Sequence, residues 1–343
     1  MTRAPRRIVR MALFVSALGI LMAACTRGLP YDSLDPAGPV ADKQADLYWL
    51  VFWIAVGVFV LVEGLLVFAM IRFRRRSADD TPRQIHGNTR LEIMWTILPA
   101  LLLAGVAVPT VGTIFDLASR PEGEVLEVNV IGHQWWWEVE YPDLGVITAN
   151  EVHVPTDRPV ALNLTSKDVI HSFSVPRLAG KQDLIPGRTN TIYLEAPRAG
   201  TYLGLCQEFC GLSHANMRFR VIAQGPADFD AWVQSQTQEA AVPPSGTLES
   251  EGMEYFSTGQ CIGCHTVSGV ESAVGKVGPD LTHLASRGTF AGAIFDLNEE
   301  NLTRWLEDAP AQKPGSKMPS GLREMGLTED QIEAMVAYLL TLE

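Results

Sequence analysis

One twelve-residue segment concentrates side chains that bind soft metal ions. It reads Cys206-Gln-Glu-Phe-Cys210-Gly-Leu-Ser-His214-Ala-Asn-Met217, so two thiols, an imidazole and a thioether lie within one loop. This set of donors suits copper better than magnesium or calcium, which prefer oxygen ligands. A further imidazole, His171, begins the strand-like run His-Ser-Phe-Ser-Val. Together these residues predict a copper site built by a loop and a strand.

Two alternatives fit the cysteine pair when it is taken alone. Cys206 and Cys210 could form a disulfide, or they could supply half of a zinc site. The histidine that follows Cys210 by four residues and the methionine that follows it by seven favour copper over both alternatives.

A second motif, Cys261-Ile-Gly-Cys264-His265, has the C-x-x-C-H pattern that is typical of c-type haem attachment. The two thiols would add to the vinyl groups of haem, and His265 would reach the iron from one side. A thioredoxin-like redox motif is the alternative, but it accompanies a βαβ pattern that the flanking sequence lacks. The motif therefore predicts a covalently bound haem c.

The second axial ligand of this haem must come from later in the chain. Met318, in Gly315-Ser-Lys-Met-Pro319, is the strongest candidate, because a methionine ligand raises the haem potential and suits an electron carrier. The competing candidates are His283, Met325 and Met335. Three other histidines show no ligand spacing and are interpreted as ordinary polar residues: His86, His133 and His153.

The composition limits the classes of protein that can carry these motifs. The 343 residues are 47% hydrophobic and 19% charged, with a formal net charge of -12. Such a balance argues against a disordered chain, and against a nucleic-acid-binding protein, which needs a basic face. Five cysteines are too few for a disulfide scaffold of this length. The length itself predicts more than one domain.

The N-terminal region has the pattern of an export signal. Residues 1–24 carry four arginines and no acid, and their apolar run is typical of a secretory signal peptide. The run ends in Leu21-Met-Ala-Ala-Cys25, which resembles the lipobox of bacterial lipoproteins and implies lipidation of Cys25. Met22 departs from the usual lipobox pattern. The alternatives are an ordinary cleaved signal or an uncleaved anchor, with Cys25 incidental.

Two apolar stretches predict membrane-spanning helices at about 47–71 and 93–117, within an N-terminal segment and hairpin of residues 25–121. The loop between them holds six arginines: Arg72, Arg74, Arg75, Arg76, Arg83 and Arg90. The positive-inside rule places this loop in the cytoplasm. We therefore expect two spans in the bacterial cytoplasmic (inner) membrane, with the mature N-terminus and the C-terminal domains on the outer, periplasmic or extracellular side.

Beyond the second span the pattern changes twice. Short runs that alternate with period two predict an all-β sandwich over residues 122–224. Residues 225–248 are polar and contain Pro-Pro, which predicts a flexible linker. Residues 249–343 predict an all-α domain, whose last helix has a capping Thr328 and an apolar stripe at Ile332, Met335, Val336 and Leu339. From residue 226 onward there are 6 basic and 18 acidic residues, so the terminal domain is acidic.

The loop pattern C-x-E-x-C-G-x-x-H-x-x-M resembles the binuclear CuA loop of cytochrome c oxidase subunit 2. Four other segments match that family in the same order over roughly residues 40–224: Glu92-Ile-Met-Trp-Thr-Ile-Leu-Pro99, Gly132-His-Gln-Trp-Trp-Trp137, His171-Ser-Phe-Ser-Val-Pro176 and Asp183-Leu-Ile-Pro-Gly187. The resemblance implies a cupredoxin-like Greek-key sandwich. The C-x-x-C-H motif, Gly278-Pro-Asp-Leu281 and the Met-Pro pair resemble class I cytochromes c.

The resemblance also implies ligands for the metals. Six residues would hold two coppers, with Cys206 and Cys210 bridging both, His171 and Met217 completing one, and His214 and the backbone carbonyl of Glu208 completing the other. The carboxylate of Glu208 would face a magnesium ion shared with subunit 1. A closed ligand shell leaves no open position for substrate, so this centre is expected to transfer electrons and not to bind oxygen.

Two residues outside the loop receive roles by the same resemblance. Trp135 would be the surface aromatic residue through which electrons enter, and Glu92 would lie near the mouth of a proton-uptake path. Each has an alternative, because alternating aromatic residues usually pack in cores or interfaces and an acid at a helix start is favoured by the helix dipole. Strand periodicity predicts that Trp136 faces opposite to its neighbours. Glu63, inside the first span, is interpreted as facing a neighbouring helix or subunit.

The fused arrangement resembles subunit 2 of a caa3-type oxidase. That resemblance implies that a donor, a cytochrome or a cytochrome bc complex, reduces the haem, and that electrons pass to CuA and on to haem a of subunit 1. Oxygen reduction and proton translocation would occur in subunit 1, which is accompanied by further membrane subunits. A flexible linker would raise the local concentration of the carrier. The alternatives are the electron-input subunit of a CuA-type nitric oxide reductase and a free membrane-anchored electron shuttle.

Overall fold

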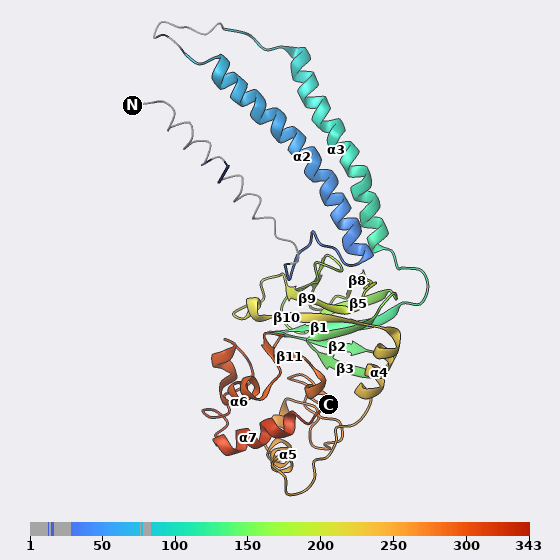
Figure 1. Ribbon diagram of the computed structural model, residues 1–343, viewed down its shortest axis with the longest axis vertical. Helices are drawn as coiled ribbons and strands as arrows, with labels where there is room; N and C mark the ends of the chain where they lie inside the picture. Colours follow the sequence, from blue (N-terminus) through green and yellow to red (C-terminus); the bar gives the residue numbers. More distant parts are fainter. Residues whose placement is uncertain (1–12, 14, 17–28, 76, 78–83) are drawn as a thin grey trace.

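The computed structural model describes residues 13, 15–16, 29–75, 77 and 84–343 (Figure 1). Along the chain it shows a hairpin of two long helices, a β-sandwich and a small helical domain, in the predicted order (Figure 1). The predicted signal peptide, apart from three residues, lies outside the described residues. So do Cys25 and two arginines of the basic loop, Arg76 and Arg83.

The hairpin consists of α2 (Pro39–Arg72) and α3 (Thr89–Ala118), which run side by side in Figure 1. Both are long and apolar enough to cross a membrane, and both extend beyond the predicted spans at each end. The side chain of Asn88 caps α3 by accepting hydrogen bonds from two amides of its first turn. Lys43 of α2 pairs with Asp116 of α3, which joins the two helices near the sandwich.

Ten strands form the two sheets of the sandwich, and each sheet has five strands. The first sheet has the order β3 (Val146–Ala149), β2 (Trp136–Tyr141), β1 (Leu126–His133), β5 (Val160–Ser166) and β8 (Asn190–Leu194). The second has the order β4 (Glu151–Pro155), β10 (Arg218–Gln224), β9 (Gly200–Cys206), β6 (His171–Ser174) and β7 (Lys181–Leu184). In each sheet one pair is parallel, β1 with β5 and β10 with β4.

The core of the sandwich lies between the two sheets and contains a cluster of three aromatic side chains. The ring of Phe173 stacks on that of Phe219 with 4.1 Å between centroids, and Trp137 packs edge-on against both at 5.8 and 5.3 Å. All three are 0–1% exposed, and burying a side chain of this size contributes roughly 1.5–3 kcal/mol. This core fixes the ends of β6 and β9, which carry His171 and Cys206.

Part of the segment predicted to be a flexible linker is helical, and this prediction is wrong for that part. α4 (Pro226–Gln236) packs against the sandwich through Phe229, which is buried, and Trp232, whose ring stacks on His153 at 4.1 Å. The physical reason is that these two aromatic side chains are spaced i, i+3 and so lie on one face of a helix. The helix can bury both against the sandwich, whereas a free linker would leave them in water. Of the polar run that suggested a linker, Gln234 and Ser235 are exposed on this helix, whereas Gln236 is buried and donates to the hydroxyl of Ser286 at 3.1 Å.

The C-terminal domain contains α5 (Leu248–Thr258), α6 (Glu299–Gln312) and α7 (Glu329–Leu339). The predicted cap of α7 is confirmed, because Thr328 and Gln331 form a reciprocal capping box. The predicted apolar stripe is also confirmed, since Ile332, Met335, Val336 and Leu339 are all buried. A two-stranded ribbon of β11 (Thr289–Phe290) and β12 (Phe295–Asp296) lies on the side of the domain nearest the sandwich (Figure 1).

Gly252 sets how closely α5 and α7 approach. A Cβ atom at this position would lie 1.9 Å from the carbonyl oxygen of Ala334, which is backbone and cannot move aside. We expect Gly252→Ala to lower the free energy of unfolding of this domain by at least about 1–3 kcal/mol, as overpacking does. Thermal unfolding of the purified protein checks this, with Glu254→Ala on the exposed face of α5 as the control. Equal melting temperatures for both variants would contradict it.

Candidate functional site

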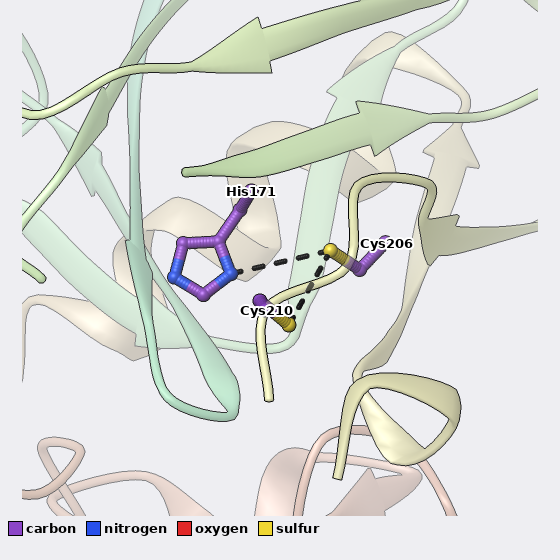
Figure 2. Close-up of side chains that lie close together, drawn as sticks. All are labelled: His171, Cys206 and Cys210. Atoms are coloured by element: carbon purple, nitrogen blue, oxygen red, sulfur yellow. Dashed lines mark hydrogen bonds between the residues drawn. The ribbon is translucent and has the colours of Figure 1, made fainter. Parts of the chain in front are cut away.

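The structure brings the predicted copper ligands together at one end of the sandwich. Cys206 ends β9 and His171 begins β6, while Cys210 lies in the loop that follows β9 (Figure 2). The Cys206 sulfur lies 3.8 Å from the Cys210 sulfur and 4.0 Å from Nδ1 of His171. The Cys210 sulfur also lies 3.6 Å from Nδ1 of His214 and 3.8 Å from the Met217 sulfur. Five soft donor groups thus converge.

The two sulfurs are free thiols and not a disulfide, because a disulfide needs about 2.05 Å between them. They share a hydrogen bond, which lowers the pKa of Cys206 to about 4 against the effect of burial. The same hydrogen bond raises the pKa of Cys210. Thiolates are the metal-binding form of cysteine, so a bound soft cation would displace the thiol protons. This donor set fits copper.

Asp168 holds the imidazole of His171, a role that the sequence analysis missed. A carboxylate oxygen of Asp168 lies 2.8 Å from Nε2 of His171, which leaves Nδ1 free on the side of the sulfurs. Burial acts to raise the pKa of Asp168, but hydrogen bonds from His171 and from the amides of Gln134 and Val169 lower it overall. The only signal in the sequence was an acid three residues before the histidine.

We expect Asp168→Asn to weaken copper binding by roughly 10- to 100-fold, as removal of a partner of a ligating histidine does. The amide keeps the size of the side chain but no longer holds a proton on Nε2 as a carboxylate does. Competition between the purified chain and a copper chelator measures the affinity. Asp143→Asn, on an exposed turn of the same domain, is the control. An unchanged affinity for Asp168→Asn would show that His171 needs no such partner.

Trp135 is not a surface residue in this chain, which corrects the prediction. Its side chain is 8% exposed, and its indole N–H donates to the carbonyl of Cys210 at 3.0 Å. The C-terminal domain covers it, because Gly315 comes so close that a Cβ atom there would lie 2.6 Å from the indole ring. The predicted alternation of the three tryptophans is confirmed, since Trp135 and Trp137 are buried and Trp136 is partly exposed.

The sequence also drew attention to three acidic residues, and the side chains of all three are exposed. The carbonyl of Glu208 is 3.3 Å from the Cys206 sulfur, whereas the residue itself is exposed. Glu92 lies in the first turn of α3, at the end of the hairpin remote from the sandwich (Figure 1). That position suits the helix-start alternative. Glu63 is exposed on α2.

The second site is a cavity of about 260 Å³ whose walls come mainly from the C-terminal domain and include Cys261, Cys264, His265 and Met318. Nδ1 of His265 lies 2.8 Å from the carbonyl of Pro279, which leaves Nε2 for a ligand. Burial lowers the pKa of His265, so the neutral, metal-binding form is favoured. Gly278 packs against the ring, because a Cβ atom there would lie 2.5 Å from Cε1.

The competing ligand candidates differ in their surroundings. His283 uses both ring nitrogens on backbone oxygens, those of Glu343 at 2.6 Å and Gln238 at 3.1 Å, and it does not line the cavity. Met325 and Met335 line the cavity, but Met335 is also a core residue of α7. The Met318 sulfur accepts a hydrogen bond from the indole of Trp305 at 3.0 Å.

Arg287 gives an independent test of what the cavity can hold. This arginine is 6% exposed and lines the cavity, and its Nε has no hydrogen-bond partner among the described residues. A buried guanidinium without a full set of partners is costly, so an anionic group on the ligand would satisfy it. Paired thiols, a free imidazole nitrogen, a thioether and this cation together fit a haem with its carboxylates.

Comparison with known proteins gives three family matches. The transmembrane domain of cytochrome c oxidase subunit II matches residues 32–112, its periplasmic domain matches residues 145–224, and cytochrome c matches residues 249–343. Cytochrome c oxidase subunit 2 of Alkalihalophilus pseudofirmus is 37% identical over 335 residues, 96% of each chain. The chain belongs to the cytochrome c oxidase subunit 2 family. It is thus an oxidoreductase subunit of a haem–copper oxidase, with a cytochrome c domain at its C-terminal end.

Two further relatives illustrate this family. Cytochrome c oxidase subunit 2 of Bacillus sp. strain PS3 is 38% identical over 344 residues, 95% of each chain. The solved periplasmic domain of subunit II of cytochrome oxidase from Bradyrhizobium japonicum is 30% identical, with a TM-score of 0.33 over 34% of this chain and 95% of that one. Membership of the family implies a copper centre in the sandwich and a haem in the cytochrome c domain, and the two apolar helices make this a two-span membrane protein.

Proposed function

We propose that this chain is the electron-input subunit of a caa3-type haem–copper cytochrome c oxidase. It takes electrons from a donor cytochrome or a cytochrome bc complex at its cytochrome domain and delivers them through its copper domain to subunit 1. There oxygen is reduced to water and protons are translocated. When bound, haem iron and a copper pair each take up and release single electrons. The chain therefore supplies electron transfer, and the oxygen-reducing site belongs to another subunit.

The observation that carries this proposal is that Trp135 belongs to both sites. Its indole N–H donates to the carbonyl of Cys210 in the copper loop, and the same residue lines the cavity that contains His265 and Met318. Two sites suited to single-electron chemistry therefore adjoin through one aromatic side chain. An arrangement of this kind supports electron transfer between the two sites.

The metal ligands that we propose for the two sites are the residues that were predicted from the sequence. The copper pair, CuA, would be held by His171, Cys206, the Glu208 carbonyl, Cys210, His214 and Met217, and haem c by Cys261, Cys264, His265 and Met318. In both sites a hydrogen bond orients the ligating imidazole. Nε2 of His171 is bonded to the carboxylate of Asp168, and Nδ1 of His265 is bonded to the carbonyl of Pro279. The free nitrogen of each ring is then available to a metal.

The copper loop also offers a surface to subunit 1. Phe209, which follows the exposed Glu208 directly, is 77% exposed, and Leu212 of the same loop is 81% exposed. Large apolar side chains at this level of exposure suit a protein partner. We propose that subunit 1 binds at this surface, with a magnesium ion at the Glu208 carboxylate. The arginine-rich loop between the two spans favours the cytoplasm, so we propose that the sandwich and the cytochrome domain lie on the outer side of the bacterial membrane.

Metal analysis and a reduced-minus-oxidised optical spectrum of the purified complex test the proposal. We expect one c-type haem and two coppers per chain, oxygen consumption that is supported by a reduced cytochrome, and co-purification of a large haem-bearing membrane subunit. Consumption of nitric oxide in place of oxygen would assign the chain to a nitric oxide reductase. Absence of the large subunit in mild detergent would indicate a free shuttle, and a chain without copper or haem would overturn the proposal.

The acidic cytochrome domain predicts the charge of the donor. This domain and the preceding helix carry 18 of the acidic residues and 6 of the basic ones, so the donor should present a basic face. We expect the rate of oxidation of an added basic cytochrome to fall at least about tenfold between low and physiological salt, because exposed charges are screened. Oxygen uptake at increasing salt measures this, with an acidic cytochrome as the control. A rate independent of salt would contradict it.

A further inference from the structure

The contact between the cytochrome domain and the copper domain buries a carboxylate. Glu151, on β4 of the copper domain, is 1% exposed. Its Oε1 accepts three hydrogen bonds from the cytochrome domain, from the amide of Gly288 at 3.0 Å and from the amide and hydroxyl of Thr289 at 3.1 and 3.0 Å. A buried carboxylate requires such donors, and those of Oε1 come from the other domain, while Oε2 lies 3.7 Å from Nε2 of His153 on the same strand.

The cytochrome domain supplies a buried side chain in return. Lys313 is 3% exposed, and its Nζ donates to the carbonyls of Trp135 and Ala291, each at 2.6 Å. Burial lowers the pKa of Lys313 to about 7, with Cys210 acting in the opposite direction. Both the charged and the neutral amine have at least two N–H groups, so either form can donate to the two carbonyls.

Between these two contacts the domains also touch through backbone, through the indole of Trp135 and through the hydroxyl of Ser213, which donates to the carbonyl of Pro314 at 2.6 Å. The ring lies between Gly211 of the copper loop and Gly315 of the cytochrome domain, where added Cβ atoms would lie 3.0 and 2.6 Å from it. The amide of Arg218 donates to the carbonyl of Gly292 at 2.9 Å, which extends the contact to β10. Trp135 is thereby closed off from solvent on the side that faces the cytochrome domain.

Buried polar groups of this kind do more than hold the two domains together, because they favour one relative position of the domains. If the cytochrome domain shifted by a few ångströms while remaining in contact, Glu151 or Lys313 would stay buried without its partners, and an unpaired buried group is costly. A surface held only by apolar contacts or exposed ion pairs would tolerate many positions. The two side chains therefore penalise every docking geometry except the observed one.

We propose that Glu151 and Lys313 are positioning residues that admit a single seating of the cytochrome domain on the copper domain. This inference rests on the proposed function and deepens it. The cytochrome domain is then a fixed part of the subunit and not a carrier that diffuses on a tether. Because it covers Trp135, an added cytochrome has no access to that residue, and electrons from every donor enter through the cytochrome domain.

Hydrogen exchange of the purified oxidase complex, followed by mass spectrometry, tests the seating without any assay of electron transfer. We expect the amides of Gly288, Thr289 and Arg218 to exchange at least tenfold faster in Glu151→Ala and in Lys313→Met than in the unaltered protein. Glu151→Gln keeps an acceptor oxygen and should restore much of the protection. The controls are Glu124→Gln and Lys276→Met, which remove the same charges from exposed positions of the same domains.

Slow exchange at these amides in both Glu151→Ala and Lys313→Met would overturn the proposal. Amides of β1 and α7 report separately whether each domain is folded. If a variant loses the protection of these core amides, the exchange of Gly288, Thr289 and Arg218 is measured instead in the unaltered protein in about 1 M salt. At that concentration exposed ion pairs are screened and buried ones are not. Protection of the three amides should persist there, and its loss would also overturn the proposal. Copper and haem contents test the proposed function independently of this result.

Discussion

Replacement of Cys210 by serine should remove copper from the protein. The Cys210 sulfur lies within 3.8 Å of three other proposed donors, the sulfurs of Cys206 and Met217 and Nδ1 of His214. A serine hydroxyl is a hard donor that stays protonated at neutral pH, so it cannot replace a bridging thiolate. We expect copper per chain to fall to roughly a tenth or less of its normal value. Oxygen consumption by the complex should fall by at least about a hundredfold, because electrons no longer reach subunit 1.

Elemental analysis and an oxygen electrode measure the two effects on the same preparation. Cys264→Ser is the matched control, since it removes one thiol from the other domain and should leave the copper content unchanged. Normal copper in Cys210→Ser would contradict the proposed ligand set. Lost oxygen consumption with normal copper would show that Cys210 serves some purpose other than binding metal.

Replacement of both Cys261 and Cys264 by serine should abolish covalent haem and unfold the cytochrome domain. The thiols are free in this structure and line the cavity of about 260 Å³. An empty cavity of that size would cost roughly 6 kcal/mol at about 24 cal/mol per Å³, which is comparable to the whole stability of a small domain. We expect no haem on the denatured chain and a loss of helical signal from this domain.

The mass of the intact chain and a haem stain after denaturing electrophoresis check the covalent bond. Cys210→Ser serves as the control, because it should keep its haem. Haem that survives denaturation in the double variant would show that the attachment lies elsewhere. A domain that stays folded without haem would show that the cavity closes when it is empty.

The identity of the axial methionine can be decided separately. We expect Met318→Leu to keep covalent haem but to change the visible spectrum and lower the midpoint potential, because a thioether ligand raises the potential. Met325→Leu, in the same loop region and lining the same cavity, is the matched control and should leave both unchanged. The reverse pattern would assign the ligand to Met325.

The two metal-binding motifs could be predicted from the sequence because their ligands lie close together along the chain. Cys206 to Met217 is one loop, and Cys261 to His265 is one turn, so covalent connection alone keeps these donors near one another. Capping and apolar stripes are local in the same sense. The Thr328 capping box and the buried face of α7 follow from residues within three or four positions of each other.

The features that the sequence analysis missed depend on weaker or longer-range signals. α4 has only two aromatic residues on its buried face, Phe229 and Trp232, amid polar neighbours. Asp168 is close to His171 in sequence, but an acid at that spacing is common, and only the fold shows that it accepts a hydrogen bond from the ring. The burial of Trp135 depends on Gly315, which is far along the chain.

The amino-acid sequence by itself determined the kinds of donor, the two long apolar helices and the order of the parts, because each depends on residue type and short-range spacing. Only the tertiary structure decided that the cytochrome domain covers Trp135 and that Glu151 and Lys313 lie buried between the domains. Lys313 and Trp135 are 178 positions apart, and no periodicity relates them. Their contact arises from the complementarity of two folded surfaces, which exists only after each domain has formed.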